Sequence, residues 1–332
     1  MGVDHGTLDG SVEAVSASPC SQSRSTSDRS ATCAVIIPTH DRPDQLGRCL
    51  AALAALTDPP DRWEVVVVDD GTPGGVAQIT DTWARADVPL RLITQQNAGP
   101  AAARNKGAAA TDATYVVFTD DDCEPQPEWL VELLRCLEAH PGDLVGGPTV
   151  PADDDSWLTA SELIVDFFRS PTRGPTRLLP SNNLACAADR FRSIGGFDTS
   201  FPAAAGEDRE FSQRWADRTG TLRLCPDAVV AHGRPLDGRS FWRQHMGYGR
   251  GAVQFRRRST TAAPAAGIRV VVALILHPFR SELVESDRIR RVGLSARVAL
   301  SQIAVVAGVL AEQRRPSTPL SSADALDRNT QT

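Results

Sequence analysis

Short apolar runs that end abruptly in polar or acidic residues recur along this chain. They are Cys33-Ala-Val-Ile-Ile-Pro38, Glu64-Val-Val-Val-Val-Asp69-Asp70 and Tyr115-Val-Val-Phe-Thr119. Runs of this length and composition predict buried strands. Because they are continuously apolar, both faces of each strand are expected to be covered, which is typical of a parallel sheet. The chain is therefore predicted to be an α/β protein with a mostly parallel, Rossmann-like central sheet flanked by helices.

Helical patterns separate these runs. Residues 43–54 begin with Pro and repeat Leu at helical spacing, and residues 100–110 begin with Pro and are rich in Ala. A further apolar run, Leu90–Ile93, precedes the second of these helices. The alternation of strands and helices brings the carboxyl ends of the strands to one edge, where open α/β sheets bind ligands.

Three acids stand side by side at one of these strand ends, Asp120-Asp121-Asp122. Adjacent carboxylates repel one another unless a cation lies between them. Mg²⁺ and Mn²⁺ prefer oxygen ligands and often bridge carboxylates to phosphates. The triplet alone is equally compatible with a solvated turn that caps the next helix. The convergence of four strand ends on one edge, three of them acidic or polar, favours a metal and phosphate site.

Seven short motifs follow one another between residues 33 and 232. They are Val35-Ile-Ile-Pro-Thr39-His-Asp-Arg42, Val67-Val-Asp-Asp-Gly71, Asn97-Ala-Gly99 with Ala103-Arg-Asn-Lys-Gly107, Phe118-Thr-Asp-Asp-Asp122, Ser181-Asn-Asn-Leu-Ala185, Gly195-Gly-Phe-Asp198 and Gly206-Glu207-Asp208. Each motif alone is weak, but their order and spacing are specific. In both respects the chain resembles the family 2 glycosyltransferases, which have a GT-A fold.

The resemblance implies roles for residues on the donor side. Asp120 and Asp122 would be the ends of an Asp-x-Asp motif that holds Mn²⁺ or Mg²⁺ against the diphosphate of a nucleotide-sugar donor, and His232 would complete the metal shell. A lone His at a strand end is also common as a surface or packing residue. The remaining donor-binding residues implied by the resemblance are Pro38, Thr39, Asp41, Asp69, Arg104 and Asp121.

The resemblance also implies a catalytic pair, Asp208 and Glu207. An acceptor hydroxyl must lose its proton as it attacks, so a carboxylate should serve as general base. Asp208 would be that base, and Glu207 would position it or touch the acceptor. Acids at the start of a helix are also stabilised by the helix dipole without any catalytic role.

The predicted activity is inverting, metal-dependent transfer of a sugar, most often from UDP in this family, to a hydroxyl of a sugar, a lipid-linked glycan or a small metabolite. Processive members carry Gln-x-x-Arg-Trp where this chain has Gln244-His-Met-Gly-Tyr248, which favours single-sugar transfer. Two alternatives remain open: a non-catalytic nucleotide-sugar-binding protein, and an Asp-x-Asp phosphotransferase, which would want Thr or Val where Glu124 stands. No Gly-x-Gly-x-x-Gly follows a predicted strand, which disfavours an oxidoreductase.

The amino-acid composition limits the binding partners and the cellular compartment that can be expected. The net charge of −6 argues against nucleic-acid binding through overall charge. Seven cysteines without a Cys-x-x-Cys pair favour reduced thiols in a cytoplasmic protein, with Cys33 and Cys186 as small core residues. The start of the chain lacks the pattern of a secretory signal peptide.

The predicted domains are a Ser-rich disordered tail (1–31), a GT-A domain (32–255, with a nucleotide-sugar half at 32–125 and an acceptor half at 126–255), a helical extension (256–315) and a disordered tail (316–332). Within them, 156–180 is predicted to be a loop and the helix around 241–251 is predicted to end at its glycines. Two interpretations of the extension stay open: packing on the enzyme's own sheet, and peripheral contact with the inner face of the cell membrane.

Overall fold

The computed structural model describes residues 32–57, 62–83, 87–169, 176, 178–201, 206–218, 220–258, 267–284 and 287–314. The two predicted disordered tails, 1–31 and 316–332, lie outside the described residues.

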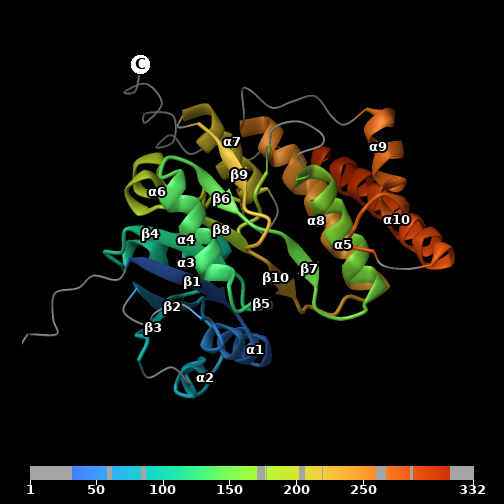
Figure 1. Cartoon of the computed structure of the whole chain (residues 1–332). Coiled ribbons are helices and arrows are strands. Elements are labelled where there is room, and N and C mark those ends of the chain that lie inside the picture. The colour runs from blue at the N-terminus through green and yellow to red at the C-terminus, as the bar shows by residue number, and fades with distance from the viewer. Residues whose placement is uncertain are drawn as a thin grey trace, which may run out of the picture. The chain divides into compact units, whose positions relative to one another are not determined.

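A seven-stranded sheet, in the order β3-β2-β1-β4-β8-β6-β9, forms the centre of the described chain (Figure 1). Strands β3, β2, β1 and β4 are parallel to one another, as are β6 and β9, whereas β8 is antiparallel to both of its neighbours. The predicted mostly parallel sheet is thus confirmed. The strands are β1 (Cys33–Thr39), β2 (Trp63–Asp69), β3 (Leu90–Thr94), β4 (Tyr115–Thr119), β6 (Leu144–Gly146), β8 (Asn183–Ala187) and β9 (Leu222–Leu224).

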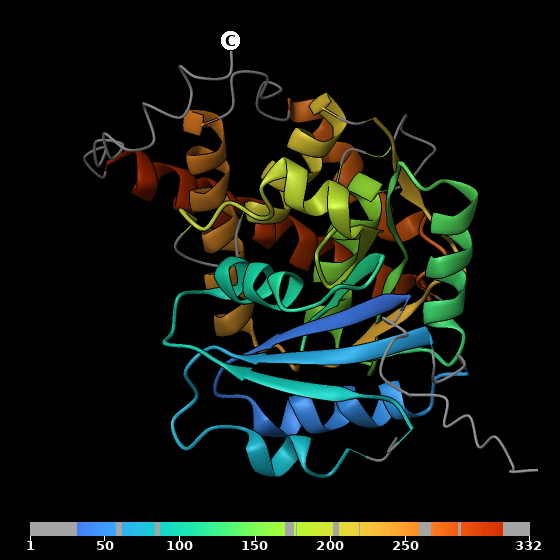
Figure 2. The same ribbon diagram turned by 90° about the vertical axis from the view of Figure 1, so that its left-hand side faces the viewer.

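Helices cover both faces of this sheet because successive side chains of each apolar strand point to opposite sides. Val35 and Ile37 pack with α1 (Pro43–Ala54), α4 (Trp129–Ala139) and the residues around α2 (Ala77–Thr80). Ala34 and Ile36 pack with α3 (Pro100–Ala109), α6 (Ala188–Ile194) and α7 (Glu207–Arg218). Figure 2 shows α1 and α2 on one side of β1–β3 and α3 on the other.

A second, three-stranded sheet lies beside the first. Its order is β5 (Cys123–Pro125), β10 (Val230–His232) and β7 (Thr149–Pro151). Strand β10 runs antiparallel to β5, and the register pairs His232 with Cys123. This pairing brings His232 next to the acidic triplet, although more than 100 residues separate them in the chain.

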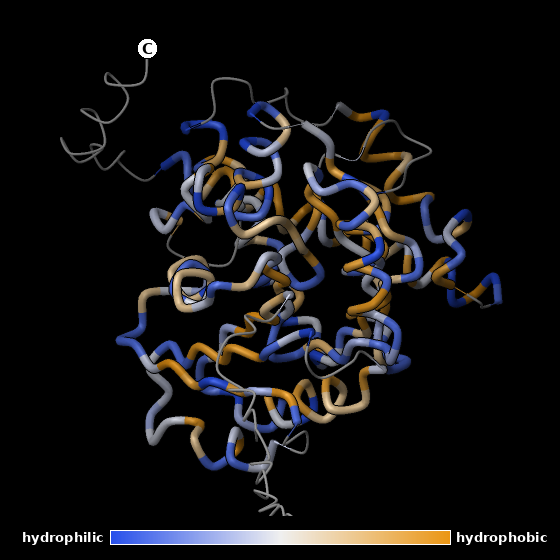
Figure 3. The backbone as a smooth tube through the Cα atoms, turned by 60° about the vertical axis from the view of Figure 1, so that its left-hand side comes forward, coloured by the Kyte–Doolittle hydropathy of each residue, from blue (hydrophilic) through white to orange (hydrophobic). Residues whose placement is uncertain are grey.

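The C-terminal helices form a third packed cluster together with α5. The elements are α5 (Ser156–Arg169), α8 (Gly238–Arg258), α9 (Ile268–Ile275), the 3₁₀ helix η3 (His277–Phe279) and α10 (Arg288–Gln313). Hydrophobic residues recur along these helices as well as along the central strands (Figure 3). Helix α8 passes through the predicted boundary between the domain and its extension, at residues 255 and 256.

Two predictions for this region are wrong. Residues 156–169 form α5 rather than a loop, because the buried Ala160, Leu163 and Phe167 recur at helical spacing and Asp155 caps the helix by accepting a hydrogen bond from the Trp157 N–H (2.8 Å). Helix α8 continues through its glycines to Arg258. Its glycine at 249 allows α10 to cross closely, since a Cβ there would lie 2.1 Å from the Val305 carbonyl oxygen.

The cysteine prediction is also wrong in part. Cys136, on α4, and Cys225 form a disulfide across 89 residues of sequence. No local spacing motif announces a pair that only the fold brings together. Cys33 and Cys186 are free thiols in the core, as predicted.

Candidate active site

The loops at the carboxyl ends of β1 and β2 interlock. Asp41, whose φ is 54°, donates its backbone N–H to the Thr72 hydroxyl (3.0 Å). Asp69 is buried and accepts a hydrogen bond from the Thr72 N–H (2.9 Å). Pro38 is buried within β1, whereas Asp41 is exposed. Of these predicted donor-binding residues, Asp41 is therefore the one with its side chain open to solvent.

Asp70 fixes the loop that leads into α3, a role that was not predicted. Its carboxylate accepts hydrogen bonds from the Gln95 side chain (2.7 Å) and from the N–H groups of Ala98 and Gly99 (both 2.8 Å). The sequence feature that could have predicted this role is the position of Asp70 directly after a buried strand and before Gly71. Hydrogen bonds within the protein thus hold the loop at this polar edge of the sheet.

The middle acid of the triplet, Asp121, points toward β1. It accepts hydrogen bonds from the Thr39 hydroxyl (2.8 Å) and from Arg42 Nη1 (2.9 Å). Burial raises the Asp121 pKa to about 6, because desolvation and the neighbouring Asp122 outweigh the lowering effect of Arg42. Arg42 also donates to Asp122 (3.1 Å), so one cation partly neutralises two acids.

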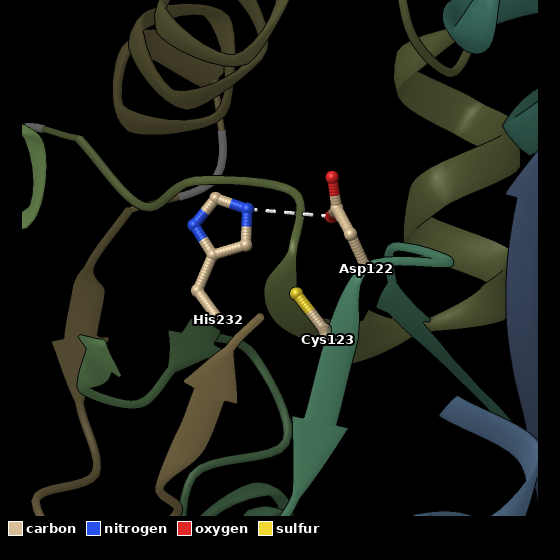
Figure 4. Close-up of side chains that lie close together, drawn as sticks. All are labelled: Asp122, Cys123 and His232. Carbon is tan, nitrogen blue, oxygen red and sulfur yellow. Dashed lines mark ion pairs between the residues drawn. The ribbon is translucent and has the colours of Figure 1, made fainter. Parts of the chain in front are cut away.

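The third acid, Asp122, faces His232 (Figure 4). Asp122 Oδ1 lies 3.3 Å from His232 Nε2, and His232 Nδ1 lies 2.9 Å from Glu162 Oε1 on α5. Burial alone would lower the His232 pKa, but hydrogen bonds to the two carboxylates raise it well above its ordinary value. The same contact holds the Asp122 pKa below its usual range despite burial. Glu162 was missed because its segment was predicted to be a loop.

Asp122 and His232 fit a divalent cation. The 3.3 Å between their facing atoms is close to the edge of an octahedron with bonds of about 2.1 Å, which is roughly 3 Å. Glu162 can accept a hydrogen bond from His232 Nδ1–H, and the Nε2 lone pair would then be free to bind a cation, as is usual for metal-binding histidines. Cys123 lies within 4.8 Å of both. Its thiol is fully buried in the core and its pKa is raised well above the ordinary value by burial, so we assign it to packing.

The first acid, Asp120, is held by Arg104. Arg104 is 3% exposed, and its Nη2 donates to Asp120 (2.6 Å) while its Nη1 lies 3.7 Å from Glu207. Burial by itself would lower the Arg104 pKa, but Asp120, Asp208 and Glu207 together raise it. Arg104 therefore joins the triplet at the end of β4 to the acids that open α7, and the predicted metal and catalytic residues belong to one charged network.

The two acids at the start of α7 have perturbed pKa values. Burial and the adjacent Asp208 raise the Glu207 pKa to about 8, against the opposing effect of Arg104. Burial also raises the Asp208 pKa, against the effects of Arg104 and of hydrogen bonds from Ser181. Asp208 Oδ1 is buried and has no hydrogen-bond partner among the described residues. A carboxylate with a raised pKa and an unpaired oxygen is suited to accept a proton.

Known proteins resemble this chain in sequence and in fold. Residues 34–193 match the model of the family described as glycosyl transferase family 2. Glycosyltransferase AglE of Haloferax volcanii is 27% identical over 225 residues, which cover 66% of this chain and 72% of that protein. A pre-mycofactocin glycosyltransferase of Mycobacterium tuberculosis is 29% identical over 206 residues, which cover 60% of this chain but 42% of that protein.

A solved structure shares the fold. Mannosyltransferase PcManGT from Pyrobaculum calidifontis, in complex with GDP-Man and Mn²⁺, superposes with a TM-score of 0.56 at 19% identity. The superposition covers 90% of this chain and 80% of that one. The likeness in fold therefore extends over most of this chain.

Proposed function

This chain carries a glycosyltransferase family 2 domain with a GT-A fold and is a glycosyltransferase, and on that premise we propose an inverting, metal-dependent reaction. A single sugar is transferred from a nucleoside-diphosphate donor to a hydroxyl acceptor. The observation that carries the proposal is the buried Arg104 side chain, which lies between Asp120 of the triplet and Glu207 at the start of α7.

On the donor side, Asp122 and His232 would hold a Mn²⁺ or Mg²⁺ ion, with Asp120 two residues before Asp122 in the chain. A bound ion would supply positive charge to stabilise the departing nucleoside diphosphate. Thr39, Asp41 and Asp69 belong to the loops that receive the nucleoside. A UDP-sugar and a GDP-sugar are both reasonable donors, since the family resemblance favours the first and the Pyrobaculum enzyme was solved with GDP-Man.

On the acceptor side, Asp208 removes the proton of the attacking hydroxyl. Its raised pKa makes it a stronger base than an ordinary carboxylate, and Arg104 opposes that rise. Glu207 positions Asp208 and, with a pKa near 8, carries a proton at neutral pH that it can donate to a sugar oxygen. Attack from the side opposite the leaving group inverts the anomeric centre.

A thermal-shift screen tests the proposal, because a ligand that binds the folded state raises its apparent stability. The screen combines UDP- and GDP-sugars with Mn²⁺, with Mg²⁺ and with a chelator. We expect Asp122→Ala to lose the metal-dependent shift. We expect Asp208→Asn to keep that shift but to lose sugar transfer, by about 10²–10⁴-fold for loss of a general base.

Asp44→Asn is the matched control, because Asp44 is an exposed acid in the first turn of α1. It should change neither donor binding nor transfer. Equal loss of donor binding in the Asp122 and Asp208 variants would contradict the proposed division of roles. A wild-type protein that neither binds nor turns over any donor would refute the proposed reaction itself.

A further inference from the structure

The solvent-facing side of α10 is apolar along nearly its whole length. Ile289, Val292, Ala296, Ile303, Val306 and Leu310 are exposed, with Ile289 at 82% and Ile303 at 60%. At 100° per residue all six fall on one side of the helix, opposite the buried side that contains Leu294, Val298 and Gly308. The stripe from Ile289 to Leu310 is about 30 Å long at 1.5 Å per residue.

Helix α9 and the following turn also expose apolar side chains. Ile268 (76% exposed), Val272 and Leu276 recur every four residues, and Phe279 is also exposed. Arg269 and Arg280 line a shallow hollow of about 340 Å³ together with the three aliphatic residues. Neither arginine forms an ion pair with any residue in the described part of the chain. Helices α9 and α10 also contact one another.

The charge of this segment is opposite to that of the whole chain. Residues 268–314 contain seven arginines against four acids, whereas the chain as a whole carries −6. A local positive charge around an apolar surface is complementary to an anionic lipid bilayer, where aliphatic side chains enter the interface and arginines meet the headgroups.

We propose that the exposed faces of α9 and α10 dock this enzyme peripherally onto the surface of an anionic lipid bilayer. The six stripe residues of α10 and the three of α9 enter the interface, and Arg269, Arg280 and the exposed Arg288 contact the headgroups. The helices lie along the membrane surface.

The side-chain chemistry favours lipid over a protein partner. Protein interfaces are enriched in aromatic residues and carry about one hydrogen bond per 100–200 Å². The α10 stripe is entirely aliphatic and offers no side-chain hydrogen-bonding group. A hydrocarbon interface requires none.

The contacts on the enzyme-facing side of α10 favour docking on the membrane surface over crossing the bilayer. By length and composition α10 could cross a bilayer, since an 18-residue window within it has a mean hydropathy of 1.8. However, Glu312 is buried and accepts a hydrogen bond from Gln254 on α8 (2.9 Å), and the Gly249 crossing fixes α10 against the enzyme. Spanning would require these contacts to be exchanged for lipid, so α10 can present only its free side.

Flotation of the full-length protein with vesicles tests the proposal. The vesicles contain phosphatidylcholine alone or phosphatidylcholine with phosphatidylglycerol. We expect binding to the anionic vesicles only, and weaker binding as salt is added. Arg269→Gln and Arg280→Gln should each weaken binding about fivefold, and Ile303→Glu with Val306→Glu should abolish it.

Ala51→Glu, at an exposed position on α1, is the control for adding charge and should bind as the wild type does. Circular dichroism and thermal unfolding verify that each variant is folded. The proposal is overturned if wild-type protein ignores anionic vesicles, or if the folded Ile303→Glu/Val306→Glu variant still floats. It is also overturned if the bound protein resists alkaline carbonate extraction, because such resistance indicates a membrane-spanning helix. A further contradicting result would be a dimeric wild-type protein that the Ile303→Glu/Val306→Glu substitutions make monomeric without changing vesicle binding.

Discussion

Replacing Arg104 by Met should be among the most destabilising single changes in this protein. The guanidinium is 3% exposed and lies 2.6 Å from Asp120 and 3.7 Å from Glu207. Met has a similar length but no charge, so the variant leaves the acids around it facing one another in a buried site. Breaking a buried ion pair in this way costs about 3–5 kcal/mol, a large share of the stability of a typical domain. Urea unfolding at neutral pH in a chelator measures the loss.

An exposed ion pair provides the comparison. Arg62 and Glu138 lie 2.7 Å apart, but their side chains are 35% and 52% exposed. Arg62→Met should therefore cost less than about 1 kcal/mol. The reasoning also predicts that Asp120→Asn recovers part of the loss caused by Arg104→Met, with a coupling of about 0.5–3 kcal/mol, because it removes the carboxylate that the arginine substitution leaves without its ion-pair partner. It is refuted if the two arginine variants lose equal stability, or if Asp120→Asn makes the Arg104 variant less stable.

Three further changes test other parts of the structure. Glu162→Gln should weaken Mn²⁺ binding about 10–100-fold in calorimetry while the protein remains folded, since it removes the carboxylate that orients the metal-binding histidine; unchanged affinity would contradict that role. Gly249→Ala should cost about 1–3 kcal/mol in thermal unfolding, because its Cβ would strike the α10 backbone, whereas Gly247→Ala on the same helix has open space and should stabilise by up to about 1 kcal/mol. Burial alone would raise the Asp166 pKa, but the hydrogen bond from His277 (2.7 Å) lowers it below its ordinary value. The ionised Asp166 therefore stabilises the fold fully above about pH 4, and this stabilisation is lost as pH falls through the lowered pKa. The stability difference between wild type and Asp166→Asn should therefore shrink below pH 4, and a constant difference would count against the assignment.

The apolar runs of the sequence were sufficient to predict the sheet. Continuous runs such as Cys33–Pro38 can be buried only when helices cover both faces, and the acids that follow them must then lie at one edge. Short strands are different: β5, β7 and β10 have three residues each, too few for any periodicity to mark them as a second sheet.

The acids of the candidate site were visible in the sequence, but their pairing was not. Motif order singled out Asp122, His232 and Asp208, since such residues follow strands or open helices at recognisable spacings. Local pattern could not show that Arg104 is buried between Asp120 and Glu207, because burial depends on segments about 100 residues apart in the chain.

The sequence by itself thus determined the four parallel strands β1–β4, most of the helices and the inventory of charged groups, because these follow from local periodicity and residue chemistry. Tertiary structure alone decided which charges neutralise one another, that Glu162 supports His232, that Cys136 meets Cys225, and that α10 crosses α8 at a glycine. It also decided which side of α10 remains uncovered, since a helix that is apolar on both sides can bury either one. Contacts between distant segments cannot be recognised from the local sequence pattern. These contacts set the pKa values, the arrangement of the candidate metal ligands and the side of α10 that remains exposed.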